Sequence, residues 1–194
     1  MPQPLETAAY LLSETDPARL PPCAAEAAFI GRSNVGKSSL LNALCRRAVA
    51  KVSDLPGRTR AINVFSVAHD RWLVDLPGYG FAAGPEAERA SWGRMIEGYL
   101  KGRASLRVIF ALIDAKVGPT RLDIQMVEWL EASGLPWRPV ATKADQVKSS
   151  RSQAGRREAA HALGVQAEEL AWVSAQSGLG LGGLRAEVSA ALSS

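Results

Sequence analysis

The chain has 194 residues, of which 47% are hydrophobic and 22% are charged, so it is long enough to bury the core of one globular domain. Its apolar runs fall short of the roughly 20 residues that a membrane-spanning helix needs, and its two cysteines are too few for a disulfide framework. The formal net charge of +4 and two basic segments, residues 46–71 and 143–157, favour RNA as a partner, although a solvated surface explains such segments equally well.

Apolar stretches of strand length alternate with segments of helical spacing. We expect residues 1–22, which are rich in proline and acidic groups, to be an N-terminal extension that packs only partly on a single domain spanning 23–194. In chain order, the predicted elements are a strand at 27–31, a helix at 38–47, a hairpin of strands at 62–68 and 71–77, a helix at 86–103, a strand at 106–114, a helix at 121–133, a strand and its loop at 136–145, a helix at 152–164, a strand at 169–175 and a helix at 181–194. This order predicts a three-layer α/β domain with a mostly parallel six-stranded sheet, one antiparallel strand and helices on both faces.

The first predicted strand leads into "GRSNVGKSS", which matches the P-loop pattern from Gly31 through Gly36 to Lys37 and Ser38. Glycines let the backbone curl so that its N–H groups face a phosphate, and the helix that follows adds its positive end. Lys37 is expected to contact the β- and γ-phosphates as a point charge, and Ser38 to offer its hydroxyl to Mg²⁺. A chance match is the alternative, and the flanking strand and helix argue against it.

Two further stretches contain the expected metal and switch residues. "DLPG" closes the second hairpin strand. There, Asp75 is expected to hold Mg²⁺ through a water, because Mg²⁺ dehydrates reluctantly, and Gly78 to turn its N–H towards the γ-phosphate. In the loop "LPGRTRA", Thr59 is the only threonine and is the expected second hydroxyl ligand of Mg²⁺, with Gly57 as a hinge. Loss of the γ-phosphate should relax both loops.

"TKAD", residues 142–145, ends a predicted strand, where ligands bind in an open α/β sheet. The carboxylate of Asp145 can accept hydrogen bonds from N1–H and the exocyclic amine of guanine, whereas adenine has an acceptor at N1 and lacks that amine. Hydrogen bonds to a charged group contribute roughly 1.5–3 kcal/mol each, which predicts GTP rather than ATP. The stem of Lys143 can lie over the base, and "SAQ", residues 174–176, can present N–H groups to guanine O6.

Four stretches in this order, "GRSNVGKSSLLNAL", "PGRTRAINVF", "DLPGYGFA" and "TKAD", resemble the EngB family (also called YihA or YsxC), bacterial GTPases of the translation-factor class. The resemblance covers about residues 22–190, nearly the whole chain. It implies one GTPase domain that depends on Mg²⁺, works in the bacterial cytoplasm and associates with the large ribosomal subunit or its precursor during assembly. It also implies a link to division-septum formation, which we interpret as a downstream consequence. We expect a monomer that does not bind membranes.

The resemblance further implies which residues contact the guanine nucleotide. The expected contacts are Gly31, Arg32, Ser33, Asn34, Val35, Gly36, Lys37, Ser38 and Ser39, then Gly57, Arg58, Thr59, Arg60 and Ala61, then Asp75, Leu76, Pro77 and Gly78, then Thr142, Lys143, Ala144 and Asp145, and finally Val173, Ser174, Ala175 and Gln176. The expected Mg²⁺ ligands are Ser38, Thr59 and Asp75. Thr142 stands where many other GTPases have asparagine, so we expect one hydrogen bond fewer and a modest nucleotide affinity.

Hydrolysis is expected to be slow. Many GTPases orient the attacking water with a glutamine after the third-motif glycine, but here that residue is Tyr79. The charge of the transition state must then be met by Mg²⁺, Lys37 and a further group, with Thr59 and Gly78 completing the expected catalytic set. One hypothesis for the further group is K⁺ held partly by Asn34, which matches the loop asparagine of related K⁺-activated GTPases; tolerance of a tight loop explains that asparagine equally well.

A second hypothesis is that Arg58 or Arg60 acts as an arginine finger within the chain, although contact with ribosomal RNA phosphate is favoured by the basic context. Two other functions stay open beside a GTPase switch. One is a nucleotide-binding scaffold with negligible turnover, which the missing glutamine permits. The other is a P-loop ATPase or small-molecule kinase, which Asp145 disfavours.

Overall fold

The computed structural model describes residues 5–51, 61–68, 70–80 and 86–193 of the chain. The strands in this part are β1 (Ala9–Glu14), β2 (Ala25–Gly31), β3 (Ile62–Ser66), β4 (Arg71–Asp75), β5 (Leu106–Asp114), β6 (Trp137–Thr142) and β7 (Ala171–Trp172). The α-helices are α1 (Lys37–Cys45), α2 (Glu86–Gly102), α3 (Arg121–Ala132), α4 (Ser149–Ala162) and α5 (Leu181–Ala191). Short 3₁₀ helices are η1 (Leu5–Thr7), η2 (Pro17–Arg19) and η3 (Ala144–Gln146).

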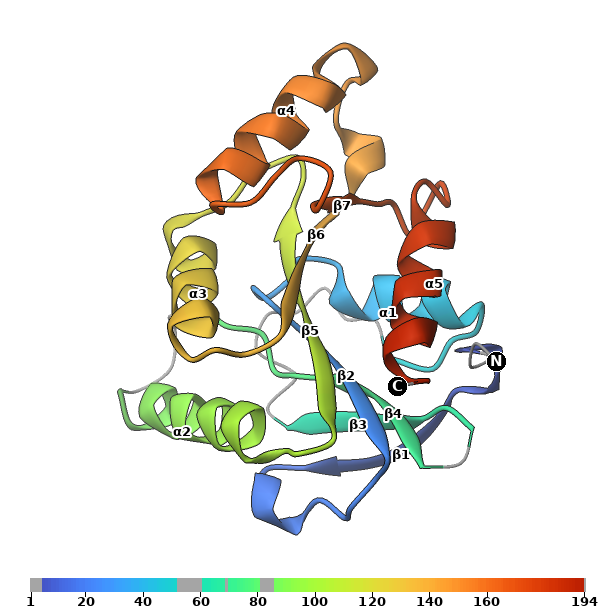
Figure 1. Ribbon diagram of the computed structural model, residues 1–194, viewed down its shortest axis with the longest axis vertical. Coiled ribbons are helices and arrows are strands. Elements are labelled where there is room, and N and C mark those ends of the chain that lie inside the picture. The colour runs from blue at the N-terminus through green and yellow to red at the C-terminus, as the bar shows by residue number, and fades with distance from the viewer. Residues whose placement is uncertain (1–4, 52–60, 69, 81–85, 194) are drawn as a thin grey trace.

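The strands form one sheet in the order β1-β3-β4-β2-β5-β6-β7 (Figure 1). β2 pairs in parallel with β4 and β5, and the parallel pairing continues from β5 through β6 to β7. Among the described strands, only β3 runs in the direction opposite to the others, and it pairs antiparallel with both β4 and β1. The predicted α/β fold, with a mostly parallel sheet and one antiparallel strand, is therefore confirmed.

The sheet has seven strands where the sequence predicts six. The additional strand, β1, lies at the edge of the sheet and comes from the segment interpreted as an N-terminal extension. Just before it, Leu5 and Ala8 are buried. Within it, Tyr10 and Leu11 are 60% and 45% exposed, so β1 lacks the alternation of buried and exposed residues that marks a half-buried strand. The edge position explains why the pattern gave no signal.

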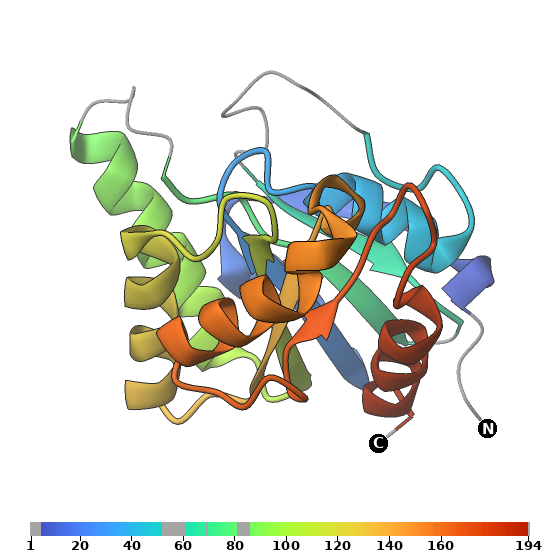
Figure 2. The same ribbon diagram turned by 90° about the horizontal axis from the view of Figure 1, so that it is seen from above.

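Helices cover both faces of the sheet, as Figure 2 shows for α1 and α5 on one side and α2 and α3 on the other. Leu41 of α1 and Leu184 of α5 share a buried cluster with Phe29 of β2. The opposite cluster combines Ile30 of β2 with Leu130 of α3, because successive side chains of a strand point to opposite faces. Among the described residues, none of the helices combines the length and apolar character needed to cross a membrane.

A buried polar cluster closes the amino end of the sheet, opposite the motifs. Glu26 of β2 is fully buried and accepts hydrogen bonds from the Tyr99 hydroxyl at 2.5 Å, the Arg103 Nε at 2.7 Å and the Ser105 hydroxyl at 2.6 Å. Burial alone raises the pKa of Glu26, but hydrogen bonds from Arg103, Ser105 and Tyr99 outweigh it and lower that pKa. Arg103 also donates to the Leu20 carbonyl at 3.2 Å, which ties the N-terminal segment to the domain.

Candidate nucleotide-binding site

The predicted motifs meet at the carboxyl end of the sheet. The phosphate loop, defined here as residues 31–38, follows β2, while Asp75 ends β4 and Thr142 ends β6. Residues 173–176 follow β7. Because parallel strands direct their carboxyl ends to one edge, where ligands bind in open α/β sheets, four of the five expected contact groups lie at that edge.

The backbone of the phosphate loop depends on a glycine and an asparagine. Gly36 precedes α1 with a φ of +95°, a left-handed conformation that residues with a Cβ rarely adopt. Asn34 is also left-handed, with a φ of 64°, and asparagine tolerates this region better than most residues. Since α1 begins at Lys37, the loop ends at the positive end of a helix, which favours anions.

Lys37 and Asp75 form a buried ion pair between the phosphate loop and the end of β4. Lys37 is 7% exposed and Asp75 is 2% exposed, so each charge depends on the other for compensation. The ammonium group predicted for phosphate and the carboxylate predicted for Mg²⁺ are therefore neighbours. Ser38 and Ser39 lie beside them in the first turn of α1.

The turn after β4 lies directly against the phosphate loop. The Tyr79 N–H bonds to the Gly31 carbonyl at 3.2 Å, and the Ser33 N–H bonds to the Tyr79 carbonyl at 3.0 Å. A Cβ on Gly78 would lie 2.9 Å from the Ser33 amide nitrogen, so a larger residue would displace one of the two segments. The third motif and the phosphate loop are thus one packed unit, with Leu76 buried beneath the turn.

The fourth motif is tied to the phosphate loop by two side chains. Thr142 Oγ1 lies 2.5 Å from the Val35 carbonyl oxygen. The Lys143 ammonium donates to the Asn34 carbonyl at 2.7 Å and to the Asp114 carboxylate at 2.7 Å. Threonine in place of asparagine therefore still bonds to the phosphate loop through its hydroxyl.

Asp145 is held by the loop after β7. Its Oδ1 accepts a hydrogen bond from the Ser174 hydroxyl at 2.5 Å, and Ser174 is fully buried. The Ser174 oxygen in turn accepts the backbone N–H groups of Gln176 at 3.2 Å and Ser177 at 3.0 Å. The loop fixes the direction of the carboxylate, while Asp145 itself is exposed and accessible to a ligand.

β7 is shorter than the strand predicted at 169–175, since only Ala171–Trp172 pair with β6. The Ser174 N–H bonds to the Leu179 carbonyl at 2.9 Å, so the chain turns away to build the loop beside Asp145. Val173 and Ser174 are nevertheless buried. Because these loop residues are buried like those of a strand, the sequence pattern predicts a longer strand than the structure contains.

Asp114 is a buried carboxylate of the site that the sequence analysis missed. It ends β5, is 7% exposed, and accepts the Lys143 ammonium as well as the backbone N–H of Lys116 at 2.9 Å. A signal for it was present, because an acidic residue closing a continuous apolar strand lies at the same edge as the other motifs.

Asp123 is the second missed carboxylate. It lies in the first turn of α3, is fully buried, and accepts hydrogen bonds from Arg32 Nε at 3.0 Å and the Tyr79 hydroxyl at 2.9 Å. The spacing of Thr120 and Asp123 is that of a capping box, which indicates the helix start. It gives no indication of the contacts with Arg32 and Tyr79.

Comparison with known proteins identifies the family. The sequence model described as "50S ribosome-binding GTPase" matches residues 26–143. The chain is 50% identical over 130 residues to the probable GTP-binding protein EngB of Thermotoga maritima, in an alignment that covers 67% of each protein. The chain belongs to the EngB family of GTP-binding proteins. The probable EngB of Pelotomaculum thermopropionicum is 46% identical over 157 residues, which cover 80% of this chain and 79% of that protein.

Solved structures share the fold of this EngB chain. The crystal structure of a probable GTP-binding protein EngB aligns with a TM-score of 0.71 at 24% identity, covering 87% of this chain and 99% of that one. Aquifex aeolicus Era bound to GDP.AlF4- aligns with a TM-score of 0.67 at 24% identity, covering 88% and 57%. As a member of a GTPase family, this chain is a GTPase, so the ATPase or kinase alternative is set aside.

In this EngB chain, Tyr79 stands where many GTPases have a glutamine, and its hydroxyl forms a hydrogen bond within the protein. Tyr79 is 8% exposed and donates to Asp123. Burial, and then the charge of Asp123, raises the pKa of the phenol above its ordinary value. The hydroxyl therefore stays protonated and serves as a donor to the buried carboxylate of Asp123.

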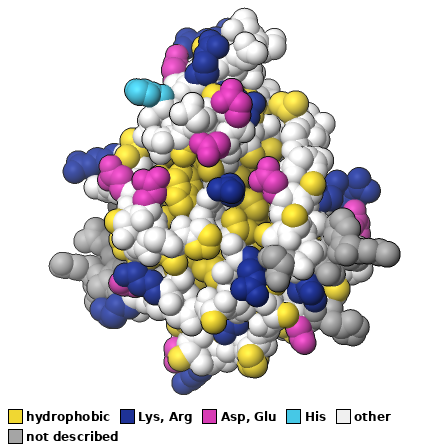
Figure 3. Space-filling view, viewed as in Figure 1, with side chains coloured by type: hydrophobic (Ala, Val, Ile, Leu, Met, Phe, Trp, Pro, Cys, Tyr) yellow, Lys and Arg dark blue, Asp and Glu magenta, His cyan; other side chains and the backbone are white. Residues whose placement is uncertain are grey.

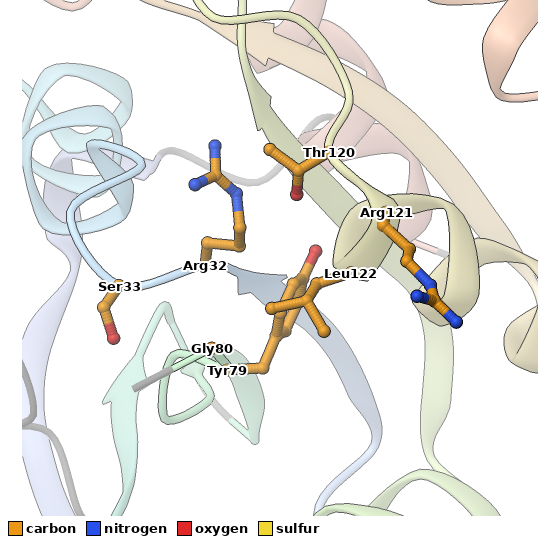
Figure 4. Close-up of a pocket in the computed structure, with 7 residues that line it drawn as sticks. All are labelled: Arg32, Ser33, Tyr79, Gly80, Thr120, Arg121 and Leu122. Atoms are coloured by element: carbon orange, nitrogen blue, oxygen red, sulfur yellow. The ribbon is translucent and has the colours of Figure 1, made fainter. Parts of the chain in front are cut away.

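A pocket of about 270 Å³ lies beside the phosphate loop of the EngB chain (Figure 4). It is lined by Arg32, Ser33, Tyr79, Gly80, Thr120, Arg121 and Leu122. The Tyr79 and Thr120 hydroxyls and the Nε of Arg32 face a common space beside the pocket, whereas Arg121 points away (Figure 4). The carboxylate of Asp123 accepts hydrogen bonds from all three of these side chains.

Part of the expected EngB site lies outside the described residues. This part comprises Gly57, Arg58, Thr59 and Arg60. The second hydroxyl ligand of Mg²⁺ and the arginine-finger hypothesis therefore stay predictions. Ala61, the last expected contact of that group, is partly buried just before β3.

Proposed function

We propose that this protein binds GTP and GDP at the carboxyl end of its sheet, hydrolyses GTP slowly with Mg²⁺, and acts as a nucleotide-dependent switch in assembly of the large ribosomal subunit. The observation that carries the proposal is the bonding of two further motifs to the phosphate loop, through the turn after β4 and through Thr142 and Lys143. The family description, a 50S ribosome-binding GTPase, supports the partner. The protein would act as a monomer in the bacterial cytoplasm, and a link to septation would follow from ribosome assembly.

In this proposal, the backbone N–H groups of residues 31–38 and the Lys37 ammonium hold the phosphates. The donor set fits Mg²⁺, because the Asp75 carboxylate and the Ser38 hydroxyl are hard oxygen ligands at adjacent places in the fold. Thr59 would complete the set. Mg²⁺ would neutralise charge on the phosphates, while nucleotide binding would give Lys37 a new partner in place of Asp75.

The guanine preference is assigned to Asp145. Its carboxylate, oriented by Ser174, would accept the N1–H and the exocyclic amine of guanine. The stem of Lys143 would lie along the base. Within the predicted stretch 174–176, the N–H of Ala175 would meet guanine O6, because the Ser174 and Gln176 N–H groups already bond within the protein. The hydrogen bonds that join Asp145 to the loop after β7 support the assignment of guanine recognition to both segments.

Slow hydrolysis is supported by the engagement of the Tyr79 hydroxyl with Asp123. We assign the stabilisation of the transition-state charge to Mg²⁺, Lys37 and a K⁺ ion held partly by Asn34. The backbone of Asn34 is left-handed and lies within the phosphate loop. Phosphate release should then be several-fold faster in K⁺ than in Na⁺ buffer of equal ionic strength. Equal rates would remove the potassium hypothesis, and no release in either buffer, with or without large subunits, would favour the scaffold alternative.

Co-sedimentation with purified large subunits tests the proposed switch. On the face shown in Figure 3, basic and acidic side chains of the described residues are interspersed, so that face offers no single basic patch. We expect more protein in the pellet with a non-hydrolysable GTP analogue than with GDP or no nucleotide, and little with small subunits. The proposal would be contradicted if the amount of protein in the pellet did not depend on the nucleotide, or if it were equal for large and small subunits. A steep loss with added salt would indicate contacts with RNA phosphates.

A further inference from the structure

Asp123 joins three segments of the chain at one buried point. Its Oδ2 accepts hydrogen bonds from Arg32 Nε at 3.0 Å and from the backbone N–H and hydroxyl of Thr120, both at 2.7 Å. Its Oδ1 accepts the Tyr79 hydroxyl at 2.9 Å. Arg32 belongs to the phosphate loop, Tyr79 to the turn after β4, and Thr120 to the start of α3. Figure 4 shows the side chains of these three residues converging.

This arrangement exceeds what capping α3 requires. A capping box needs only the reciprocal bonds of Thr120 and Asp123, which belong to the helix itself. Arg32 and Tyr79 bring the carboxylate a guanidinium and a phenol from elements distant in sequence. A fully buried carboxylate depends on all its hydrogen-bond donors, because each lost bond leaves part of the desolvation cost of the charge uncompensated. The network therefore holds Arg32 and Tyr79 in one arrangement.

The network acts on the turn that contains Gly78. Tyr79 follows Gly78 directly, and its backbone pairs with the phosphate loop on both sides. The Trp92 ring meets the Tyr79 ring edge-on at 6.4 Å between centroids, and its indole N–H donates to the Pro77 carbonyl at 3.3 Å. The Gly78 N–H belongs to the same peptide as the Pro77 carbonyl, so the bond from Trp92 restrains that peptide on one side of Gly78. The phosphate loop and Asp123 hold Tyr79 on the other side.

We propose that Asp123 is a positioning residue for GTP: through Tyr79 it sets Gly78 for the γ-phosphate, although Asp123 itself contacts no nucleotide. The proposal rests on the proposed function and on the contact with the γ-phosphate that the sequence predicts for the Gly78 N–H. It adds a residue of α3 that none of the sequence motifs contains. Because GDP has no γ-phosphate, loss of this positioning should weaken binding of GTP selectively.

Tyr79→Phe is the sharpest test, because it removes one hydroxyl and leaves the ring packed against Trp92. Dissociation constants for a non-hydrolysable GTP analogue and for GDP are measured for the wild type and the variant with Mg²⁺ present. We expect the analogue to bind about tenfold more weakly, the scale of one hydrogen bond to a charged group, while GDP affinity changes less than twofold. Asp123→Asn, which keeps the shape and removes the charge, should give the same selective loss.

Tyr99→Phe is the matched control. The Tyr99 hydroxyl also donates to a fully buried carboxylate, that of Glu26, but at the opposite end of the sheet. This variant should lower the melting temperature and leave the ratio of the two dissociation constants unchanged. If Tyr79→Phe weakens both nucleotides equally, or neither, the proposal is overturned. If the wild type binds neither nucleotide, the proposed function itself fails, which is a separate result.

Discussion

Replacing Lys37 with methionine is expected to weaken GTP and GDP binding by on the order of 10³-fold, because an ammonium that bonds to two phosphates contributes roughly 1.5–3 kcal/mol per bond. The same change should lower the free energy of unfolding by about 3–5 kcal/mol, the usual cost of leaving one member of a buried ion pair alone. The loss of stability is expected because Asp75, which is 2% exposed and paired with Lys37, would be left as an unpaired buried charge. Calorimetric titration measures the first effect, and urea denaturation measures the second.

The double variant Lys37→Met with Asp75→Asn separates the two effects. Removing both charges should recover most of the lost stability, since no unpaired charge stays buried. Nucleotide affinity should stay low, because neither the phosphate cation nor the metal carboxylate is restored. Wild-type affinity in Lys37→Met, or recovered affinity in the double variant, would show that Lys37 does not bind phosphate.

Replacing Asp145 with asparagine is expected to lower GTP affinity by about 10²-fold or more, because two donors of guanine would lose a charged acceptor. The same variant should gain affinity for xanthosine triphosphate. Xanthine has a carbonyl at C2 in place of the amine, and the asparagine amide can donate to it. Competition against a fluorescent GTP analogue measures all three nucleotides, with ATP as the third.

Asp70→Asn is the control for this change. Asp70 is exposed in the hairpin before β4, at the opposite end of the sheet, and its φ of 57° suits asparagine. It should keep the nucleotide preference of the wild type. If Asp145→Asn also keeps that preference, the base is read elsewhere and the assignment of the fourth motif is wrong.

Local patterns predicted the elements that build the site. The strand at 27–31 and the helix at 38–47 correspond to β2 and α1, with boundaries that differ by at most two residues. They were predictable because a buried strand, a glycine loop and a helix follow one another within a short stretch. The hairpin that leads to Asp75 was predictable because two apolar stretches of strand length are separated by a short connection.

Long-range partners were not predictable from such patterns. Arg32 and Asp123 are separated by 91 positions, and neither has a local reason to bind the other. β1 pairs with β3 although Glu14 and Ile62 lie far apart in the sequence. The exposed side chains of β1 give no pattern from which that pairing could be predicted. The ion pair of Lys37 and Asp75 also depends on two strands lying in register. Only the fold brings these groups together.

One edge of the sheet is proposed to bind a guanine nucleotide through the phosphate loop and Asp145. Titrating GTP, GDP and ATP into the purified wild-type protein with Mg²⁺, by calorimetry, tests it most directly. We expect saturable heats for GTP and GDP and none for ATP. Absence of heat with both guanine nucleotides, or ATP binding as tightly as GTP, would contradict it.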